Sequence, residues 1–317
     1  MRTIHFRLTL GHLAMAAAVL AASPAFAATC DKACLEQIAA KYHAAWLAHN
    51  VKLAPFSKRV RFVENNVEMT LPDGSWDTVS QAVGTPLVLS DPKTGQVGMY
   101  TTVLQSTDTQ TYAAIRLRVE GGQITEIEHV LSTKRNLSSP PTPFGDVYKN
   151  PRDPEFTRIV PPAERATREQ LKAQALAYFS TLENNNGEIR GAHFAPTATR
   201  NENGLQFPDI EKGFKSGRYG FNNRVRDRDC SLVDEERSAV MCRGYIDHKG
   251  VMDEVPLTDG TKSKSAFREP QTWSFLESFK VKNGMITAIE ATFTAAPYYI
   301  HSPYTKKPDP VYDALKH

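Results

Sequence analysis

The sequence predicts an α+β protein in which one unit, a helix followed by a curved antiparallel sheet, occurs twice along the chain. Three pairs of similar segments carry this prediction, because matches that recur in the same order indicate an internal repeat. The pairs are 34–50 with 170–186, 64–65 with 202–203, and 121–132 with 282–294. The offset between the copies grows from 136 to 162 residues, so the second copy contains about two dozen additional residues.

The first residues have the pattern of an export signal. Arg2 and Arg7 make a positive start, residues 13–22 are apolar, and residues 25–27 (Ala-Phe-Ala) form a typical cleavage site. We therefore expect residues 1–27 to be removed after Ala27 and the mature protein to be periplasmic or secreted. The apolar run is too short to span a bilayer as a mature helix, and an uncleaved N-terminal anchor is the alternative.

The repeat and the composition together divide the mature chain. We expect a first domain at 28–135 and a second at 166–300. Between them, residues 136–165 are rich in proline and are typical of an extended linker that runs over a surface. Residues 301–317 are expected to form an extended C-terminal tail.

Each unit is expected to open with a long amphipathic helix. In the first copy, apolar residues recur at helical spacing and predict one buried face. These residues are Leu35, Ile38, Tyr42, Ala45 and Trp46. In the second copy, Thr167 and Gln170 have the spacing of a capping box and predict the start of the helix.

Alternating strands with turn residues between them follow each helix. The pair Gly121-Gly122 separates two alternating segments and predicts a hairpin. The repeated Glu-Asn pairs are expected to end a strand in a turn, because Asn66 and Gly204, which follow them, both tolerate a positive φ angle.

The net charge gives no case for a polyanionic partner. The full chain has a formal charge of +3, and removing the two arginines of the signal leaves +1. A chain close to neutrality has no electrostatic attraction to nucleic acid or to an anionic membrane surface. We therefore expect no nucleic-acid partner, and no membrane contact after the signal is cleaved.

The four cysteines are expected to form two disulfides, since an even number in an oxidising compartment favours pairing. Cys30 and Cys34 lie one helical turn apart, and Cys230 and Cys242 flank two short strands around a charged turn. The expected pairs are therefore 30–34 and 230–242. A zinc site is the competing interpretation, but no His/Cys pair has the usual ligand spacing beside them.

Several segments resemble a known family. They include "VRFVENNVEMTLPDGSWDTV", "RLRVEGGQITEIEHV", "RATREQLKAQALAYFSTLE" and "LVDEERSAVMCRGYIDHKG". The chain resembles a secreted, two-copy family of SnoaL-like (nuclear-transport-factor-2-like) proteins of uncharacterised function from bacteria and fungi. The resemblance implies two tandem cone-fold, or cystatin-like, domains. It also implies a pocket between the helix and the concave sheet of each domain, and pairing of the two domains as an intrachain pseudo-dimer.

In the second copy, Arg200 and Glu202 lie two residues apart on one predicted strand, so their side chains point the same way. Such a pair can orient a ligand, and Glu202 can act as a base if burial raises its pKa. A structural ion pair, or a turn at Asn203-Gly204, is the alternative. In the first copy Phe62 replaces the arginine, which favours a structural role for Glu64.

The other candidates come from the second half of the chain. His248 follows Asp247 at a predicted strand end and is a candidate acid or base. Neighbouring strand residues point to opposite faces, however, and a surface histidine is the favoured alternative. Asn203, His193 and Trp273 are candidate ligand-binding residues, for which a turn, helix packing and core packing are the alternatives. No metal or cofactor is expected, because no common metal or nucleotide motif occurs.

Two functions remain open from the sequence. The first is a cofactor-independent acid–base enzyme, such as a lyase, isomerase or hydrolase, acting on a small organic molecule in the second domain. The greater charge and length of the second copy favour it. The second is a non-catalytic module that binds a small molecule or a partner, favoured by the absence of any residue set that demands catalysis.

Overall fold

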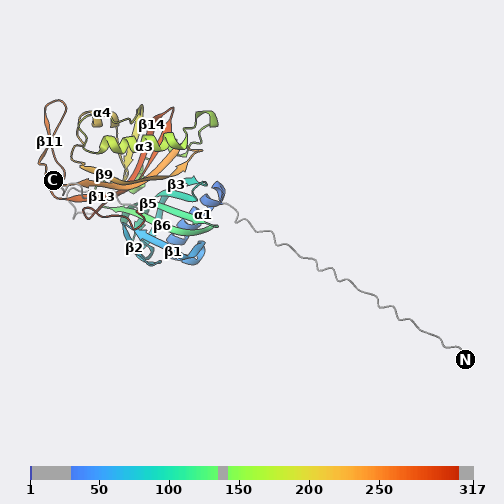
Figure 1. Cartoon of the computed structure of the whole chain (residues 1–317). Helices are drawn as coiled ribbons and strands as arrows, with labels where there is room; N and C mark the ends of the chain where they lie inside the picture. The colour runs from blue at the N-terminus through green and yellow to red at the C-terminus, as the bar shows by residue number, and fades with distance from the viewer. Residues whose placement is uncertain (2–29, 135–141, 307–317) are drawn as a thin grey trace.

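The computed structural model describes residues 30–134 and 142–306 together with Met1 (Figure 1). It contains a six-stranded sheet in each half of the chain, so the protein is α+β with two sheet-dominated domains. The expected signal peptide at 1–27 lies outside the described residues, as do the first part of the linker and the end of the tail.

The first domain consists of one 16-residue helix, short helical turns and six strands. The elements are α1 (Lys32–Leu47), η1 (Val51–Leu53), β1 (Phe56–Glu64), β2 (Val67–Met69), α2 (Ser75–Thr78), β3 (Val79–Asp91), β4 (Gln96–Gln105), β5 (Thr109–Glu120) and β6 (Gln123–Thr133).

The described part of the connecting segment, from residue 142 on, contains three turns of 3₁₀ helix, and the second domain repeats the order of the first. The turns are η2 (Val147–Lys149), η3 (Pro154–Thr157) and η4 (Pro162–Glu164). The second domain consists of α3 (Arg168–Leu182), β7 (Phe194–Glu202), β8 (Leu205–Phe207), α4 (Ile210–Lys215), β9 (Arg224–Asp234), β10 (Ala239–His248), β11 (Glu254–Pro256), β12 (Lys262–Lys264), β13 (Gln271–Lys282) and β14 (Met285–Ala296).

The two sheets have equivalent strand orders, β2-β1-β6-β5-β4-β3 and β8-β7-β14-β13-β10-β9. The extra hairpin β11–β12 belongs to the second domain alone and accounts for part of its additional length. The prediction of wholly antiparallel sheets is wrong, because β1 pairs with β6, and β7 with β14, in parallel. Residue alternation identifies strands but does not reveal which strands distant in sequence become neighbours.

Local signals in the sequence correspond to the observed elements. All five apolar residues of the expected helix face are at most 5% exposed on α1. The capping box at Thr167 and Gln170 opens α3 as predicted. Gly121 and Gly122 both have positive φ between β5 and β6, which confirms the expected hairpin turn.

The two sheets pack against each other through their outer faces. A cluster of buried apolar residues from both sheets forms this contact, and Figure 1 shows β3 and β5 adjacent to β9 and β13. Gly98 of β4 faces Met241 of β10, and a Cβ at Gly98 would collide with the methionine side chain. Gly98 and Met241 occupy equivalent positions in the two sheets. Gly98 is paired with Arg116 of β5, Met241 is paired with Ser278 of β13, and Arg116 and Ser278 are themselves equivalent residues.

The segments that follow each domain also cover this contact. Val147 and Phe156 of the connecting segment are buried. Tyr304, which follows the second domain, is 7% exposed and donates its hydroxyl to the backbone oxygens of Arg61 and Ile127 in the first. The residues after each sheet therefore help to hold the two domains together.

Both predicted disulfides, Cys30–Cys34 and Cys230–Cys242, are present, and no cysteine is free. Two disulfides indicate an oxidising, extracytoplasmic environment. Within the described residues, no helix combines the length and apolar character needed to cross a membrane.

Candidate functional site

A cavity of about 310 Å³, here called the site cavity, lies between α3 and the inner face of the second sheet. In Figure 1, α3 lies on the side of this sheet that faces away from the first domain. Most of the cavity wall is apolar, formed by Leu182, Phe207, Phe221, Ile246, Trp273, Phe275, Ala291 and Phe293. Its polar and charged lining includes Tyr178, Arg200, Glu202, Tyr219 and Glu277, together with Arg218, Asn222, Ser263 and Lys264.

Two carboxylates of the site cavity belong to one row across three neighbouring strands. Glu202 of β7 is paired with Ala291 of β14, and Ala291 is paired in turn with Glu277 of β13. Neighbouring strands lie about 4.8 Å apart, so the two glutamates start about 10 Å apart with only the Ala291 methyl group between them. The small central residue leaves space above the sheet for a molecule that touches both carboxyl groups.

Arg200 holds the polar side of the site cavity together. Its guanidinium group is 3.0 Å from Glu202 through Nε, and it donates to the Tyr178 hydroxyl at 3.2 Å and to the Tyr219 hydroxyl at 2.7 Å. The whole residue is only 3% exposed. An arginine fixed by three partners is a preorganised charge, because little side-chain freedom remains to be lost when a ligand binds.

The two glutamates have different electrostatic surroundings. Burial, reinforced by the negative charge of Glu202, raises the pKa of Glu277 to about 8. Burial also raises the pKa of Glu202, but Arg200 and Arg218 oppose the rise. At neutral pH the site therefore holds a protonated carboxyl group at Glu277, whereas Arg200 favours the ionised form of Glu202.

The site cavity contains three of the residues proposed from the sequence, Arg200, Glu202 and Trp273. Trp273 forms part of its wall, and its buried indole nitrogen has no hydrogen-bond partner within residues 30–134 and 142–306. The remaining three, Asn203, His193 and His248, are not among the residues that line it.

His248 lies behind the wall of the site cavity. It is fully buried, which corrects the interpretation of a surface histidine, because its ring stacks on Phe267 at 3.5 Å and its Nε2 contacts Asn222. Burial lowers its pKa to about 3, so the imidazole is neutral. It does not pair with Asp247, which instead binds Arg226. His248 thus supports the wall that contains Asn222.

Asn203 is a turn residue whose side chain is occupied by the backbone. It has positive φ, as does Gly204 after it. Its amide group accepts a hydrogen bond from the Phe293 nitrogen and donates to the oxygens of Phe293 and Pro143. In the first domain Asn65 accepts from the Leu131 nitrogen in the same way. The repeated Glu-Asn pair is therefore a shared turn, as predicted.

His193 lies at the surface, before the start of β7. Its side chain is exposed, and its backbone groups bond with Gln174 and Ile286. Its backbone therefore links the middle of α3 to β14, but the exposed side chain does not pack between helix and sheet and does not line the site cavity.

In the first domain, side chains fill the space that is equivalent to the site cavity. The row that corresponds to Glu202–Ala291–Glu277 is Glu64–His129–Ile115, so a histidine replaces the small alanine. His129 is 1% exposed and bonds with Tyr42 at 2.7 Å, with Glu64 beside its other ring nitrogen at 3.3 Å. Trp76 is also completely buried there. Glu64 thus belongs to a buried polar network, which agrees with the structural role expected for it from the sequence.

Glu277 is not among the site residues predicted from the sequence, although the residue pattern around it indicates a buried carboxylate. The residues Trp273, Phe275, Glu277 and Phe279 alternate along β13 and so share the inner face of the sheet. A single carboxylate in a row of aromatic residues is unusual, because burying a charge is costly unless it is compensated.

Among the described residues, no group of three or more His, Cys, Asp or Glu is arranged to hold a metal ion.

Comparisons with known proteins give a family match for part of the chain. Residues 164–293, which cover most of the second domain, match a family model described as "Domain of unknown function (DUF8021)". No curated protein matches the chain.

Several solved structures are similar to part of the chain. AclR of Streptomyces galilaeus, a protein proposed to be a hydroxylase, is 15% identical over 33% of this chain and 82% of its own, with a TM-score of 0.27. An NTF2-like protein of unknown function from Cytophaga hutchinsonii is 12% identical over 31% of this chain and 89% of its own (TM-score 0.25). A de novo designed protein with a curved β-sheet is 17% identical over 41% of this chain and 88% of its own, with a TM-score of 0.26. Scores at this level add no weight to a functional assignment.

Proposed function

We propose that the second domain binds a small, largely apolar organic molecule in the site cavity and catalyses a proton transfer on it without a cofactor. The observation that carries this proposal is the row Glu202–Ala291–Glu277 within an apolar wall. Two carboxyl groups whose surroundings differ can divide the roles of acid and base between them.

The roles follow from the two environments. Glu202, beside Arg200, is the group that accepts a proton from a carbon or oxygen atom of the substrate. Glu277, whose pKa is raised to about 8 by burial, donates a proton or a hydrogen bond to the atom where negative charge develops. This pairing suits a lyase or an isomerase, in which one proton leaves and another arrives.

A non-catalytic binding protein is the second candidate. The observation that favours it is that Arg200 already has three protein partners, so the polar groups form a closed network without a ligand. In that case the carboxyl groups would only select ligands by hydrogen bonding.

The proposal also includes the fold of the two halves and the way they pair. We infer that both halves are SnoaL-like cone domains arranged as an intrachain pseudo-dimer. The equivalent strand orders and the apolar cluster between the outer faces support this inference. Export through a signal cleaved after Ala27 is supported by the residue pattern at the start of the chain and by the two disulfides.

A ligand screen tests binding at this site. The mature chain is melted in the presence of small organic acids, ketones and aromatic compounds, and compounds that raise the melting temperature are confirmed by calorimetry. Ala291→Leu places a larger side chain on the cavity floor and should abolish binding. The matched control is Ala33→Leu on the exposed surface of α1, which should bind as the wild type does.

Charge-removing variants then test the role of the carboxyl groups. Glu202→Gln should weaken binding or abolish turnover while the fold survives, because the change alters charge and not shape. Glu64→Gln, the equivalent change in the first domain, should leave ligand binding intact. Equal behaviour of Glu202→Gln and the wild type would assign Glu202 to the turn and favour the binding module.

A further inference from the structure

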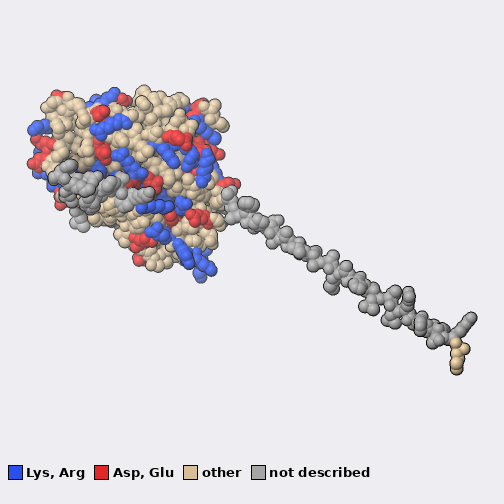
Figure 2. Space-filling view, in the orientation of Figure 1, with Lys and Arg blue, Asp and Glu red and all other residues tan. Residues whose placement is uncertain are grey.

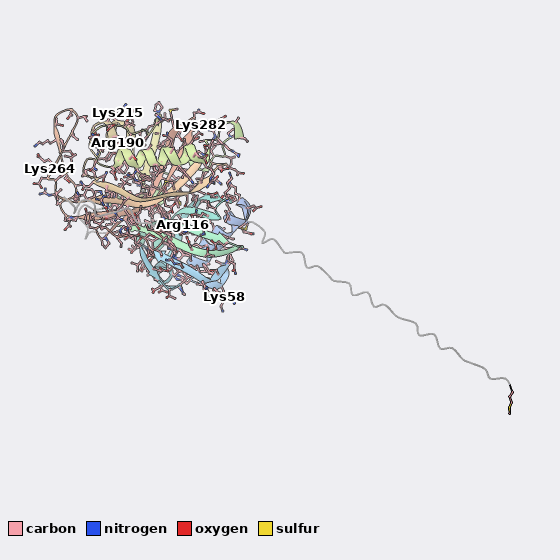
Figure 3. The ribbon with its side chains drawn as sticks, viewed as in Figure 1. Lys58, Arg116, Arg190, Lys215, Lys264 and Lys282 are labelled. Carbon is pink, nitrogen blue, oxygen red and sulfur yellow. A yellow bond between two sulfur atoms is a disulfide. The ribbon has the colours of Figure 1, made fainter. Side chains whose placement is uncertain are left out.

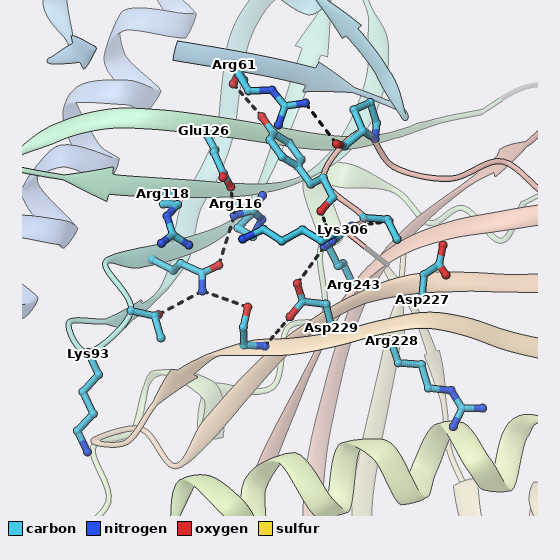
Figure 4. Close-up of a pocket in the computed structure, with 16 residues that line it drawn as sticks. Arg61, Lys93, Arg116, Arg118, Glu126, Asp227, Arg228, Asp229, Arg243 and Lys306 are labelled. Atoms are coloured by element: carbon cyan, nitrogen blue, oxygen red, sulfur yellow. Dashed lines mark hydrogen bonds and ion pairs between the residues drawn. The ribbon is translucent and has the colours of Figure 1, made fainter. Parts of the chain in front are cut away.

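A second cavity, of about 680 Å³, lies between the two domains and shares no lining residue with the site cavity. Strands β1, β4, β5 and β6 of the first domain, with the turn between β3 and β4, form one wall, and β9 and β10 of the second form the other. Residues 303–306, after the last strand, form its edge. Figure 4 shows this interdomain cavity with its lining side chains.

Basic side chains outnumber acidic ones in the lining of the interdomain cavity. Seven basic and three acidic side chains line it, an excess of four positive charges among the lining residues. Glu128, Glu120 and Glu235, just outside the lining, pair with Arg116, Arg118 and Lys93. Figure 2 shows both signs of charge interspersed over the visible face of the molecule, so the excess is a local feature. In Figure 4, Arg116, Arg243 and Lys306 lie near the centre, with Arg118 and Lys93 to one side.

Two of these arginines are buried and held in fixed positions. Arg116 is 6% exposed and donates through Nε to Glu128 at 2.8 Å and through Nη1 to Glu126 at 3.0 Å. Arg243 is 8% exposed and is held by Asp229 at 3.3 Å and by the Tyr304 backbone oxygen at 3.1 Å. Guanidinium groups fixed in this way bind carboxylate or phosphate oxygens with little loss of entropy.

The floor between the domains supplies further polar contacts. Gln96 is 3% exposed, and its amide nitrogen donates to Thr94 in its own domain at 3.2 Å and to Ser231 of the second at 3.1 Å. Its oxygen accepts from Arg116 at 3.3 Å. The cavity floor is thus a hydrogen-bonded link between the domains.

The basic side chains at the rim have weak competing partners. Lys93 pairs with Glu235, and Arg118 with Glu120, and in both pairs both side chains are more than one-third exposed. Exposed ion pairs contribute little free energy, so a multivalent anion can displace these carboxylates. The volume lies within the range of small-molecule sites and exceeds what one acetate-sized group needs.

We propose that the interdomain cavity binds a small organic or inorganic anion with at least two acidic groups. One group lies against Arg116 and Arg243, and the second is bound by Lys93 and Arg118. Because residues of both domains supply these contacts, the anion also stabilises the docking of the domains.

Calorimetry of the mature chain with citrate and with pyrophosphate, in chloride buffer at constant ionic strength, tests the proposal. The variant is Lys93→Gln with Arg118→Gln, since both side chains are exposed enough for the fold to survive. The matched control is Lys58→Gln with Arg59→Gln, two exposed residues of β1. Figure 3 shows Lys58 at the far end of the first domain and Arg116 near the second.

We expect at least one of the two anions to bind. Tighter binding of citrate would indicate a carboxylate ligand, and tighter binding of pyrophosphate would indicate a phosphate ligand. The cavity variant should lose about tenfold in affinity, as expected for a lost charged hydrogen bond, while the control variant keeps the wild-type value. Absence of binding by both anions to the folded wild type would overturn the proposal. So would equal losses in the cavity variant and the control.

Discussion

The Tyr245 hydroxyl of the second domain donates a 2.8 Å hydrogen bond to the side-chain oxygen of Asn66, in the turn of the first domain's Glu-Asn pair. Ser274 donates to the same oxygen at 3.1 Å. The equivalent turn residue of the second domain, Gly204, lies against Tyr112 of the first, where a Cβ would collide with the tyrosine ring. Each turn therefore contacts the opposite sheet, which explains why one turn has asparagine and the other requires glycine.

Removing the hydroxyl of Tyr245 should weaken the contact between the domains. Tyr245→Phe leaves the Asn66 oxygen with one donor fewer and should lower the free energy of unfolding by about 1 kcal/mol. Chemical denaturation measures the change. Tyr148→Phe, at an exposed position, is the matched control and should be neutral. Equal stability of the two variants would show that the turn contact contributes nothing.

The two domains should not be stable when separated. Residues 28–140 and 165–317, expressed alone, would each expose the apolar outer face of a sheet that the other domain covers. Large exposed apolar faces cause aggregation. Gel filtration and thermal melting of the two halves check this, and two monomeric, cooperatively melting halves would contradict it.

The Cys230–Cys242 disulfide should contribute more to stability than the Cys30–Cys34 disulfide. It closes the longer loop, with a sequence separation of 12 against 4, and the chain-entropy model assigns it about 2–3 kcal/mol. Denaturation of the two double-serine variants compares them. A larger loss for the Cys30–Cys34 variant would contradict the expected order.

Glu277 should make stability depend on pH. Its pKa rises from 4.5 in the unfolded chain to about 8 in the folded protein, so the folded state binds more protons between these values. Its contribution is fully present below about pH 4.5 and is lost as the pH rises through about 8. The difference in unfolding free energy between wild type and Glu277→Gln should therefore fall over this range. A difference that stays constant with pH would mean that Glu277 is ionised throughout.

Features that depend on neighbours in the chain were predictable from the sequence. The capping box at Thr167, the turns after the Glu-Asn pairs and both disulfides follow from spacing and residue type. The parallel pairing of β1 with β6 was not predictable, because alternation does not specify partners distant in sequence.

The candidate site was only partly predictable for the same reason. Arg200 and Glu202 share one strand, so their common direction follows from alternation. Glu277 joins them only because β14 lies between β7 and β13. His248 is buried because Phe267, from the segment after β12, stacks on its ring, and a single sequence contains no signal for that contact.

Hydrogen–deuterium exchange of a bound ligand tests the central claim most directly. A compound that binds the site cavity is incubated in D₂O with the wild type, with Glu202→Gln and with Glu277→Gln, and NMR follows the loss of its carbon-bound protons. We predict exchange with the wild type and strongly reduced exchange with both variants, although each still binds the compound. Binding without exchange in the wild type, or exchange that both variants retain, would contradict a catalytic role for this pair of glutamates.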